Sequence, residues 1–324
     1  MTNLTSANIR AWSRLGQMGT FFGVALLEIA KSRDSVKVLT ADLAFLSGLN
    51  RFKTSYPDRF INVGIAEQNM IGIAAGLAME GNCVFTTTYA TFITMRSFEQ
   101  IRHNLGYHNL NVKVIGSSAG LAMGMSGNTH YAIEDLSLIR TIPNLIVLSP
   151  ADSVEAYMTA LAAAESDLPI YIRLTGGLNC PIVYNESYDF SIGKSIMLRE
   201  GGDVTIIASG TMVYVSLEAA KLLESYGISA AVINMHTIKP IDKEAIEIAC
   251  KRSQLIVTVE EHNVVGGLGA AVSEYKSTLK NTPIQLFIGI PDTFCKPGDY
   301  KYLLDYYELS PNSIAQKIKK TMKQ

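Results

Sequence analysis

Apolar residues recur along this chain with two alternating periods, which predict a regular succession of helices and strands. Residues 8–31 carry apolar side chains three and four positions apart and end in basic residues, as amphipathic helices do. An apolar run over residues 36–40 then predicts a strand, with the polar Asp42 just beyond its carboxyl end. The succession continues with a strand-like run at 60–63, a helix at about 66–80, a strand at 83–88 and a helix at about 92–105.

Several of the predicted strands are unbroken apolar runs rather than alternating ones. Further strands are expected at 111–116, 145–149 and 169–174, with helices near 134–140 and at 153–165. Strands that are apolar on both faces are typical of a parallel sheet that helices cover on both sides. Because ligands of such sheets bind beyond the carboxyl ends of the strands, the residues that follow each strand are the ones to inspect for chemistry.

The pattern lapses between residues 176 and 195, and a second alternating series then begins. Its expected strands lie near 203–208, 229–235, 255–260 and 284–290, and its helices near 213–226, 243–252, 269–279 and 312–322. We therefore predict an α/β protein with two doubly wound domains, a mainly parallel one over residues 1–190 and a smaller one over residues 191–324.

Composition narrows the class of protein. Of 324 residues, 48% are hydrophobic and 18% are charged, which suits a large core and argues against disorder. The net charge is −1 and no long basic run is present, so we expect neither nucleic acid nor an anionic membrane as a partner. The N-terminus lacks a signal-like pattern, and polar residues interrupt the apolar stretches, so we expect a cytoplasmic protein.

Three segments that follow predicted strands contain side chains suited to chemistry. Glu67 begins a helix after the run at 60–63, although the helix dipole alone also favours a carboxylate there. Phe92, with Tyr89, follows the strand at 83–88 and could either stack on a flat heterocycle or pack in the core. His130 ends the glycine-rich segment 124–130, where it suits proton transfer or contact with a polar substrate, but a lone histidine is weak support for a site.

The second domain offers one superficial phosphate motif. Gly266, Gly267 and Gly269 follow the acidic pair Glu260 and Glu261, but they lack both the GxGxxG spacing and the lysine of a P-loop. We interpret them as a tight strand-to-helix connection.

Taken in order, these segments resemble the transketolase family along most of the chain. Each motif alone is weak, and the ordered set at suitable spacing is specific. The matching segments are Thr40-Ala41-Asp42-Leu43, Gly64-Ile65-Ala66-Glu67-Gln68-Asn69, Tyr89-Ala90-Thr91-Phe92, Gly127-Asn128-Thr129-His130, Pro143-Asn144-Leu145, Ser149-Pro150-Ala151-Asp152, Ile238-Lys239-Pro240-Ile241-Asp242, and Glu260-Glu261-His262 with Gly266-Gly267-Leu268-Gly269.

The resemblance implies a pyrimidine-binding domain followed by a transketolase C-terminal domain. It assigns Glu67 to the carboxylate that hydrogen-bonds the aminopyrimidine ring of thiamine diphosphate and Phe92 to the aromatic residue that stacks on that ring. It further implies that His130 contacts oxygens of the donor sugar, so that Glu67 and His130 are the candidate catalytic residues. The residues that it implies line the bent cofactor are Asp42, Leu43 and Ile65.

Single-chain members of the family also hold the diphosphate and Mg²⁺ through a Gly-Asp-Gly motif, which this sequence lacks. The resemblance therefore implies that a second polypeptide holds the diphosphate and Mg²⁺, with no metal ligand supplied by this chain. Because pyrimidine domains of the family pair, it implies a heterotetramer with two copies of each chain, as one subunit of a split transketolase.

Several positions depart from the family pattern for sugar phosphates. Gly19 stands where many relatives have an arginine, Ser118 where they have a second histidine, and Ser126 where many have an aspartate. Arg173 does match an arginine that contacts phosphate. We count Ser126, His130 and Arg173 as the substrate-binding candidates. We expect either that the substrate is not an ordinary ketose phosphate or that the partner chain supplies the missing contacts.

The activity that these features favour is transfer of a two-carbon ketol unit from a ketose to an aldose. Two alternatives use the same cofactor: the β subunit of a 2-oxoacid dehydrogenase and a subunit of the type that makes deoxyxylulose phosphate. A non-catalytic regulatory paralogue is a third alternative, which Glu67, Phe92 and His130 argue against, because a scaffold needs none of them.

Overall fold

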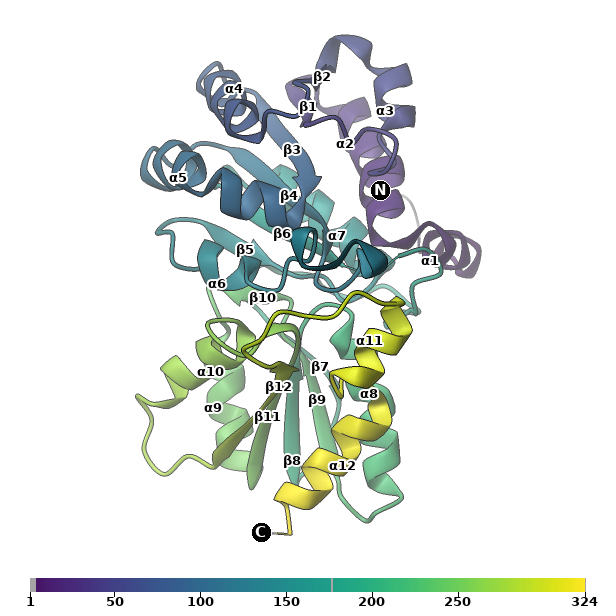
Figure 1. Cartoon of the computed structure of the whole chain (residues 1–324), viewed down its shortest axis with the longest axis vertical. Coiled ribbons are helices and arrows are strands. Elements are labelled where there is room, and N and C mark those ends of the chain that lie inside the picture. The colour runs from purple at the N-terminus through teal and green to yellow at the C-terminus, as the bar shows by residue number, and fades with distance from the viewer. Residues whose placement is uncertain (1–3, 176, 324) are drawn as a thin grey trace.

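The chain folds around two sheets, which lie one above the other in Figure 1. The computed structural model describes residues 4–175 and 177–323. The upper sheet has seven strands in the order β10-β5-β6-β4-β3-β1-β2, and the lower sheet has five in the order β12-β11-β8-β9-β7. Parallel pairs dominate both sheets, and each is packed against helices. The predicted α/β class with two doubly wound units is therefore confirmed.

The upper sheet is built mostly from the first half of the chain. Its strands are β1 (Val36–Thr40), β2 (Phe60–Asn62), β3 (Cys83–Tyr89), β4 (Val112–Ala119), β5 (Ile146–Leu148) and β6 (Ile170–Thr175). The helical segments around it are α1 (Ser6–Thr20), η1 (Phe21–Ala25), α2 (Leu26–Ser32), α3 (Asn50–Ser55), η2 (Pro57–Arg59), α4 (Glu67–Met79), η3 (Phe92–Arg96), α5 (Phe98–Gln100), η4 (Ile101–Tyr107), η5 (Gly124–Thr129), α6 (Asp135–Ile139) and α7 (Ser153–Glu165).

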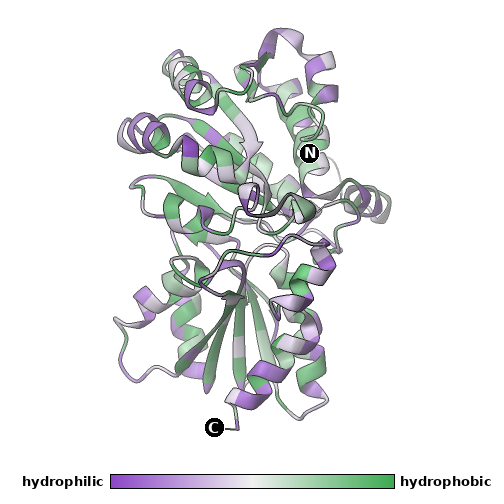
Figure 2. Cartoon of the chain, viewed as in Figure 1, coloured by the Kyte–Doolittle hydropathy of each residue, from purple (hydrophilic) through white to green (hydrophobic). Residues whose placement is uncertain are grey.

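Helices cover both faces of this sheet, which explains the unbroken apolar runs. Val38 of β1 and Phe85 of β3 belong to the cluster that includes α1, α2 and α7, whereas Leu39 and Val84, one position away, belong to the cluster that includes α4. Successive side chains of a strand point to opposite faces, so a strand covered on both sides is mainly apolar on both faces. In Figure 2 the buried strands are largely green, with paler stretches where polar residues such as the threonines of β3 interrupt them.

The lower sheet comes from the second half. Its strands are β7 (Ile196–Arg199), β8 (Val204–Ala208), β9 (Ala230–Asn234), β11 (Leu255–Asn263) and β12 (Ile284–Ile290). Its helices are α8 (Met212–Glu224), α9 (Lys243–Arg252), α10 (Leu268–Lys276), α11 (Tyr300–Tyr306) and α12 (Pro311–Thr321). The edge strand β7 pairs antiparallel with β9, and neither β7 nor α11 was expected from the hydrophobic pattern.

One strand crosses between the two units. β10 (Thr237–Lys239) belongs to the second half of the chain but pairs antiparallel with β5 at the edge of the upper sheet. Three residues are too few to show a hydrophobic period, so this strand was not expected. The proposed division at residue 190 remains a prediction. β10 lies after residue 190 in the sequence but belongs to the sheet formed by the residues before it.

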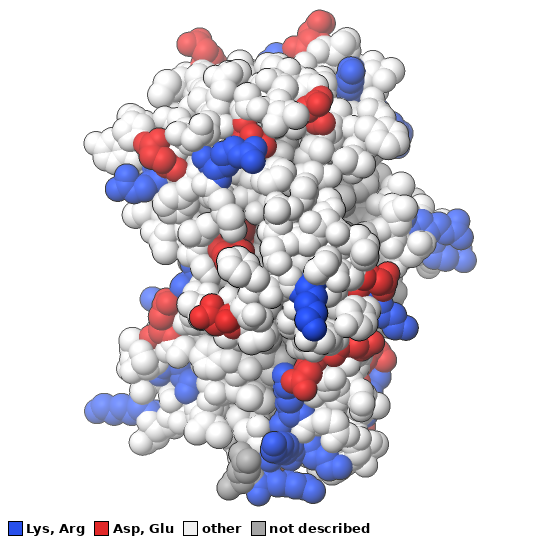
Figure 3. Space-filling model, in the orientation of Figure 1, with Lys and Arg blue, Asp and Glu red and all other residues white. Residues whose placement is uncertain are grey.

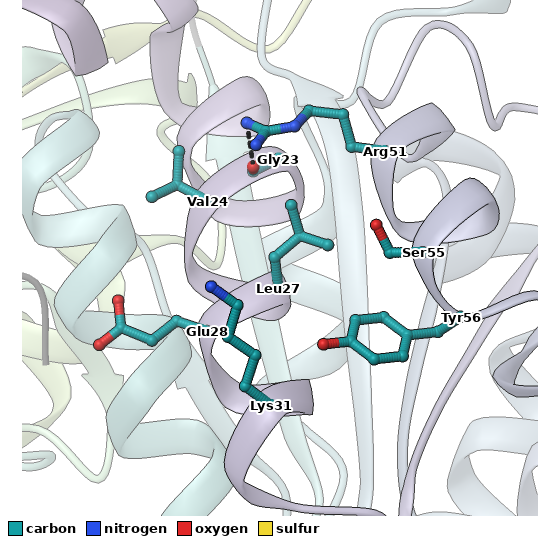
Figure 4. Close-up of a pocket in the computed structure, with 8 residues that line it drawn as sticks. All are labelled: Gly23, Val24, Leu27, Glu28, Lys31, Arg51, Ser55 and Tyr56. Atoms are coloured by element: carbon teal, nitrogen blue, oxygen red, sulfur yellow. Dashed lines mark hydrogen bonds between the residues drawn. The ribbon is translucent and has the colours of Figure 1, made fainter.

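The N-terminal helix is one continuous feature of the sequence but not of the structure. The predicted helix 8–31 is present as α1, the π-helical turn η1 and α2, with a break at Gly16, whose φ is +70°. A side chain at Gly16 would meet the carbonyl oxygen of Gly177 at 2.3 Å, so this position needs glycine. In the π turn, the Gly23 carbonyl oxygen accepts a hydrogen bond from Arg51, and a cavity of about 400 Å³ opens beside them (Figure 4).

Arg173 and Asp135 form a buried ion pair within the upper unit, and Arg173 also contacts the lower unit. Arg173 Nε lies 2.8 Å from Asp135 Oδ2, and the two side chains are 3% and 0% exposed. Arg173 Nη2 also donates to the carbonyl oxygens of Ala132, at 3.0 Å, and of Glu261 in the lower sheet, at 2.9 Å. These contacts tie β6 to β11.

Within the described residues, no helix is both long and apolar enough to cross a bilayer.

Replacing Arg173 by methionine should lower the free energy of unfolding by about 3–5 kcal/mol, because the Asp135 carboxylate would stay buried without its cation. Urea unfolding at one fixed chain concentration measures the difference.

Arg252→Met is the matched control, since the ion pair of Arg252 with Glu200 lies at the surface, with side chains 39% and 71% exposed. It should change the free energy of unfolding by about 1 kcal/mol or less. Equal, small effects of the two substitutions would contradict the role given to Arg173.

Candidate active site at the carboxyl edge of the upper sheet

Four neighbouring strands bring most of the predicted site residues to one edge of the upper sheet. β4, β3, β1 and β2 are consecutive in the sheet and run parallel, so their carboxyl ends point the same way. Asp42 and Leu43 follow β1, Ile65 and Glu67 follow β2, Phe92 follows β3, and Ser126 and His130 follow β4. This is the edge at which open α/β sheets bind ligands.

Glu67 is the first residue of α4, and its carboxylate is buried. Glu67 is 3% exposed, and its Oε1 accepts a hydrogen bond from Arg96 Nη1 at 2.7 Å. A first-turn carboxylate is stabilised by the helix dipole. Burial of a carboxylate is costly unless it is paired, so Arg96 explains how Glu67 is tolerated at this position.

The rings of Tyr89, Phe92 and His130 form an aromatic cluster beside Glu67. Their centroids lie 5.4–5.8 Å apart in edge-to-face arrangements, which are favourable for aromatic pairs. Burial raises the pKa of Tyr89, which keeps its hydroxyl protonated at neutral pH. Arg96 lies over the Phe92 ring at 4.6 Å from the centroid, so one guanidinium links the aromatic cluster to Glu67.

A π-helical turn sets the relative position of Phe92 and Arg96. η3 begins at Phe92 and ends at Arg96, directly after β3. π turns are rare and occur mostly as single turns, often at functional sites. Here the turn places the cation on the face of the aromatic ring.

A separate set of hydrogen bonds fixes the residues after β1 and β2. The Asn62 amide oxygen accepts from the backbone N–H groups of Asp42, at 3.0 Å, and of Gly64, at 3.1 Å. Asn62 Nδ2 donates to the Asp42 carboxylate at 3.1 Å. Asp42 has a φ of +58°, in the left-handed region that aspartate tolerates better than most residues. Next to these turns, Ile65 is 78% exposed.

The segment with Ser126 and His130 forms a short 3₁₀ helix, η5. Thr129 Oγ1 lies 2.9 Å from His130 Nδ1 and also donates to the carbonyl oxygen of Ser126. Ser126 is exposed, and the His130 ring is half-buried against the aromatic cluster. The structure therefore brings His130 together with Phe92, and Arg96 connects Phe92 to Glu67.

Arg173 does not join this group. Its guanidinium is held by Asp135 and by the carbonyl oxygens of Ala132 and Glu261. Contact of Arg173 with a substrate phosphate stays a prediction, and the placement of this residue favours a structural role instead. At the other departures from the family pattern, Ser118 Oγ lies 3.7 Å from the Met18 sulfur, and Gly19 packs against Gly48.

The glycines after β11 do not form an open phosphate cradle. The Glu260 carboxylate accepts hydrogen bonds from the backbone N–H groups of Leu268, at 2.7 Å, and of Gly269, at 2.8 Å. The anion position at the start of α10 is thus occupied by a side chain of the protein itself. The interpretation of this segment as a tight connection is confirmed.

Sequence reasoning missed Arg96 and Asn62 as parts of the site. Arg96 lies four residues after Phe92 in a predicted helix, and that spacing alone signals a shared face. Its contact with Glu67 joins residues 29 positions apart in the sequence, which no local pattern reveals. Asn62 carries no motif beyond its position at the end of a strand.

The arrangement fits one half of a binding site for a flat heterocycle. A buried carboxylate oxygen can accept a hydrogen bond from a ring N–H, and the Phe92 ring offers a surface for stacking. The sequence-based prediction places thiamine diphosphate here, against Glu67 and Phe92, with Asp42, Leu43 and Ile65 along its flank. In Figure 3, charged side chains of both signs are scattered over the upper half of the visible face, with uncharged surface between them.

Comparison with known proteins agrees with this geometry. The family "Transketolase, pyrimidine binding domain" matches residues 16–180, and "Transketolase, C-terminal domain" matches residues 193–314. A putative transketolase C-terminal section from Methanocaldococcus jannaschii is 40% identical over 304 residues, which is 93% of this chain and 95% of that protein.

One further relative is described as a transketolase subunit, and one solved structure as a split-gene transketolase. A 6-deoxy-6-sulfo-D-fructose transketolase subunit from Clostridium sp. is 40% identical over 294 residues, 90% of each chain. A solved structure described as a split-gene transketolase in an inactive β4 tetramer superimposes with a TM-score of 0.86 at 39% identity, over 95% of this chain and 98% of that one. The chain therefore belongs to the transketolase family and corresponds to the C-terminal section of its members, with a pyrimidine-binding domain followed by a transketolase C-terminal domain.

Proposed function

We propose that this chain is one subunit of a thiamine-diphosphate-dependent, transketolase-type enzyme that transfers a two-carbon ketol unit from a ketose to an aldose. The observation that carries the proposal is the buried Glu67 carboxylate beside an open aromatic cluster at the ligand edge of the sheet. A buried carboxylate with one cationic partner still has an oxygen free to accept a hydrogen bond from a ligand.

Each residue of the site then has a distinct task. Glu67 accepts a hydrogen bond from the aminopyrimidine ring, and Arg96 holds the Glu67 carboxylate in place. Phe92 offers its ring for stacking on the pyrimidine. The bound cofactor supplies the electron sink for breaking a bond to a carbonyl carbon. His130, at the edge of the aromatic cluster, contacts the sugar oxygens and moves protons to and from them.

A second polypeptide completes the site in this proposal by holding the diphosphate and Mg²⁺. Apolar side chains at the same sheet edge are exposed and need cover: Phe45 and Ile65 are each 78% exposed, and Leu46 is 57% exposed. The relatives described as a C-terminal section, a subunit and a split-gene chain, which this chain spans almost completely, also support a separate partner. The expected assembly is a heterotetramer with two copies of each chain.

The sugar substrate is proposed to differ from an ordinary ketose phosphate, unless the partner chain supplies the phosphate contacts. Ser118 has a thioether neighbour, and Arg173 is already bound to Asp135, so neither surrounding favours a phosphate. A relative described as acting on a sulfonated ketose supports a search beyond sugar phosphates.

A donor screen on the assembled enzyme tests this substrate proposal. It should include xylulose 5-phosphate and sugars with a sulfonate or a free hydroxyl at the terminal carbon. The expected best donor lacks the terminal phosphate. The proposal would be contradicted if xylulose 5-phosphate is turned over as fast as the best donor and this rate persists after the partner's phosphate contacts are removed.

Glu67→Gln should lower kcat for ketol transfer by about 100-fold or more, because the amide keeps the shape of the side chain but loses the charge that the proton transfer needs. The assay uses the assembled enzyme at saturating thiamine diphosphate and Mg²⁺, with thermal unfolding as a check that the fold is intact.

Glu99→Gln is the matched control, since Glu99 is exposed on α5 and contacts Gln100. Its kcat should equal that of the unmodified enzyme. A Glu67→Gln enzyme with near-normal kcat would overturn the assignment. Consumption of pyruvate or another 2-oxoacid in place of ketol transfer would favour the alternatives that share the cofactor, and a lack of any turnover would favour the regulatory paralogue.

A further inference from the structure

The loop of residues 121–130, which ends in His130, is closed at its base within the upper unit. Gly120 and Ala132 form an antiparallel bridge, with hydrogen bonds of 2.8 Å and 3.1 Å in the two directions. Inside the loop, Gly127 has a φ of +69°, and its carbonyl oxygen accepts from the backbone N–H of His130 at 2.9 Å. The bridge fixes where the loop starts and ends but leaves its tip to other contacts.

The tip of this loop is bound by the lower unit. Asn128 Oδ1 accepts from the backbone N–H of Cys295 at 2.7 Å, and Asn128 Nδ2 donates to the Cys295 carbonyl oxygen at 2.5 Å. One amide side chain thus satisfies both backbone groups of a residue 167 positions away in the sequence. The Tyr131 hydroxyl lies 3.1 Å from the Lys296 carbonyl oxygen and also contacts the Gly124 carbonyl oxygen inside the loop.

The segment that receives Asn128 is itself well anchored. It runs from the end of β12 to α11, and Figure 1 shows it passing between the two sheets. Asn128 of η5 contacts it through Cys295. Cys295 is buried, and the Lys296 N–H donates to the Tyr307 hydroxyl at 2.8 Å. The loop also needs glycine for close approach, since a side chain at Gly124 would meet the Gly298 carbonyl oxygen at 3.1 Å. An anchored partner can hold the loop in one position.

A second contact fixes the entry to the loop from the same side. Glu261 of β11 accepts from the backbone N–H of Leu121 through Oε1 at 2.7 Å. Its other carboxylate oxygen accepts from the hydroxyls of Thr211, at 2.7 Å, and Tyr300, at 2.6 Å. The lower unit therefore forms hydrogen bonds with the loop both at its beginning, Leu121, and at its tip, Asn128.

We infer that the C-terminal half of this chain positions His130 through the Asn128–Cys295 contact, which makes Asn128 a positioning residue for the reaction. The catalytic consequence rests on the proposed function, whereas the contact itself does not. Between Asn128 and His130 there is one residue, Thr129, which lies 2.9 Å from the His130 ring nitrogen. A shift of the loop tip therefore moves His130 relative to Phe92. Misplacement of a reacting group by about 1 Å can cost about 100-fold in rate.

The test is Asn128→Ala, with two readouts. Hydrogen exchange of this chain should become faster at residues 121–130 and at Cys295, whose N–H loses its acceptor, and stay unchanged at α4, which makes no contact with Asn128. In the assembled enzyme, kcat should fall by about 10- to 100-fold, while the affinity for thiamine diphosphate stays unchanged, because Glu67, Phe92 and Asp42 are untouched.

Asn128→Asp provides a second, milder variant, because it keeps an acceptor for the Cys295 N–H and loses only the donor to the Cys295 carbonyl oxygen. Asn312→Ala, at an exposed asparagine of α12, is the matched control. Faster exchange at 121–130 in Asn128→Asp but not in Asn312→Ala supports the inference. Exchange at 121–130 equal to that of the unmodified chain in Asn128→Ala overturns the contact. Faster exchange with unchanged kcat overturns its role in positioning. If the unmodified complex transfers no ketol unit, the proposed function fails, and exchange alone still decides whether the lower unit holds the loop.

Discussion

The parallel pairing of β4, β3, β1 and β2 is the constraint on which the rest of the site depends. Parallel strands bring their carboxyl ends to one edge, so residues from four separate parts of the chain meet there without a long loop. Burial of apolar surface on both faces of these strands offsets the conformational entropy that is lost when the residues at the edge are ordered. The site itself can then contain a buried carboxylate, Glu67, and a half-buried aromatic cluster.

The sequence predicts these strands and helices because their pattern is local. A mainly apolar run such as Val204–Ala208 or Ala230–Asn234 indicates a strand with both faces covered, wherever its partners lie. β10 was missed because its three residues form a strand only through pairing with β5. The break at Gly16 was missed because it accompanies the close contact with Gly177, which no sequence pattern near Gly16 reveals.

The same division applies to the site. Motif order placed Glu67, Phe92 and His130 at one edge, and the structure brings them together. The contact of Arg96 with Glu67, and that of Asn128 with Cys295, join distant residues and could not be predicted. Arg173 is a different case. Its match to a motif led to a predicted phosphate contact, which stays a prediction, and in the structure Arg173 is bound to Asp135. The acidic residues Glu260 and Glu261 likewise hold backbone N–H groups within the protein.

The central claim is that this chain carries only the pyrimidine side of a shared site. Isothermal titration of thiamine diphosphate with Mg²⁺ tests it most directly, first into this chain alone and then into its mixture with the candidate diphosphate-binding subunit. The account predicts measurable binding only in the mixture. Tight binding by this chain alone would contradict the account, because it would require a diphosphate site within these 324 residues.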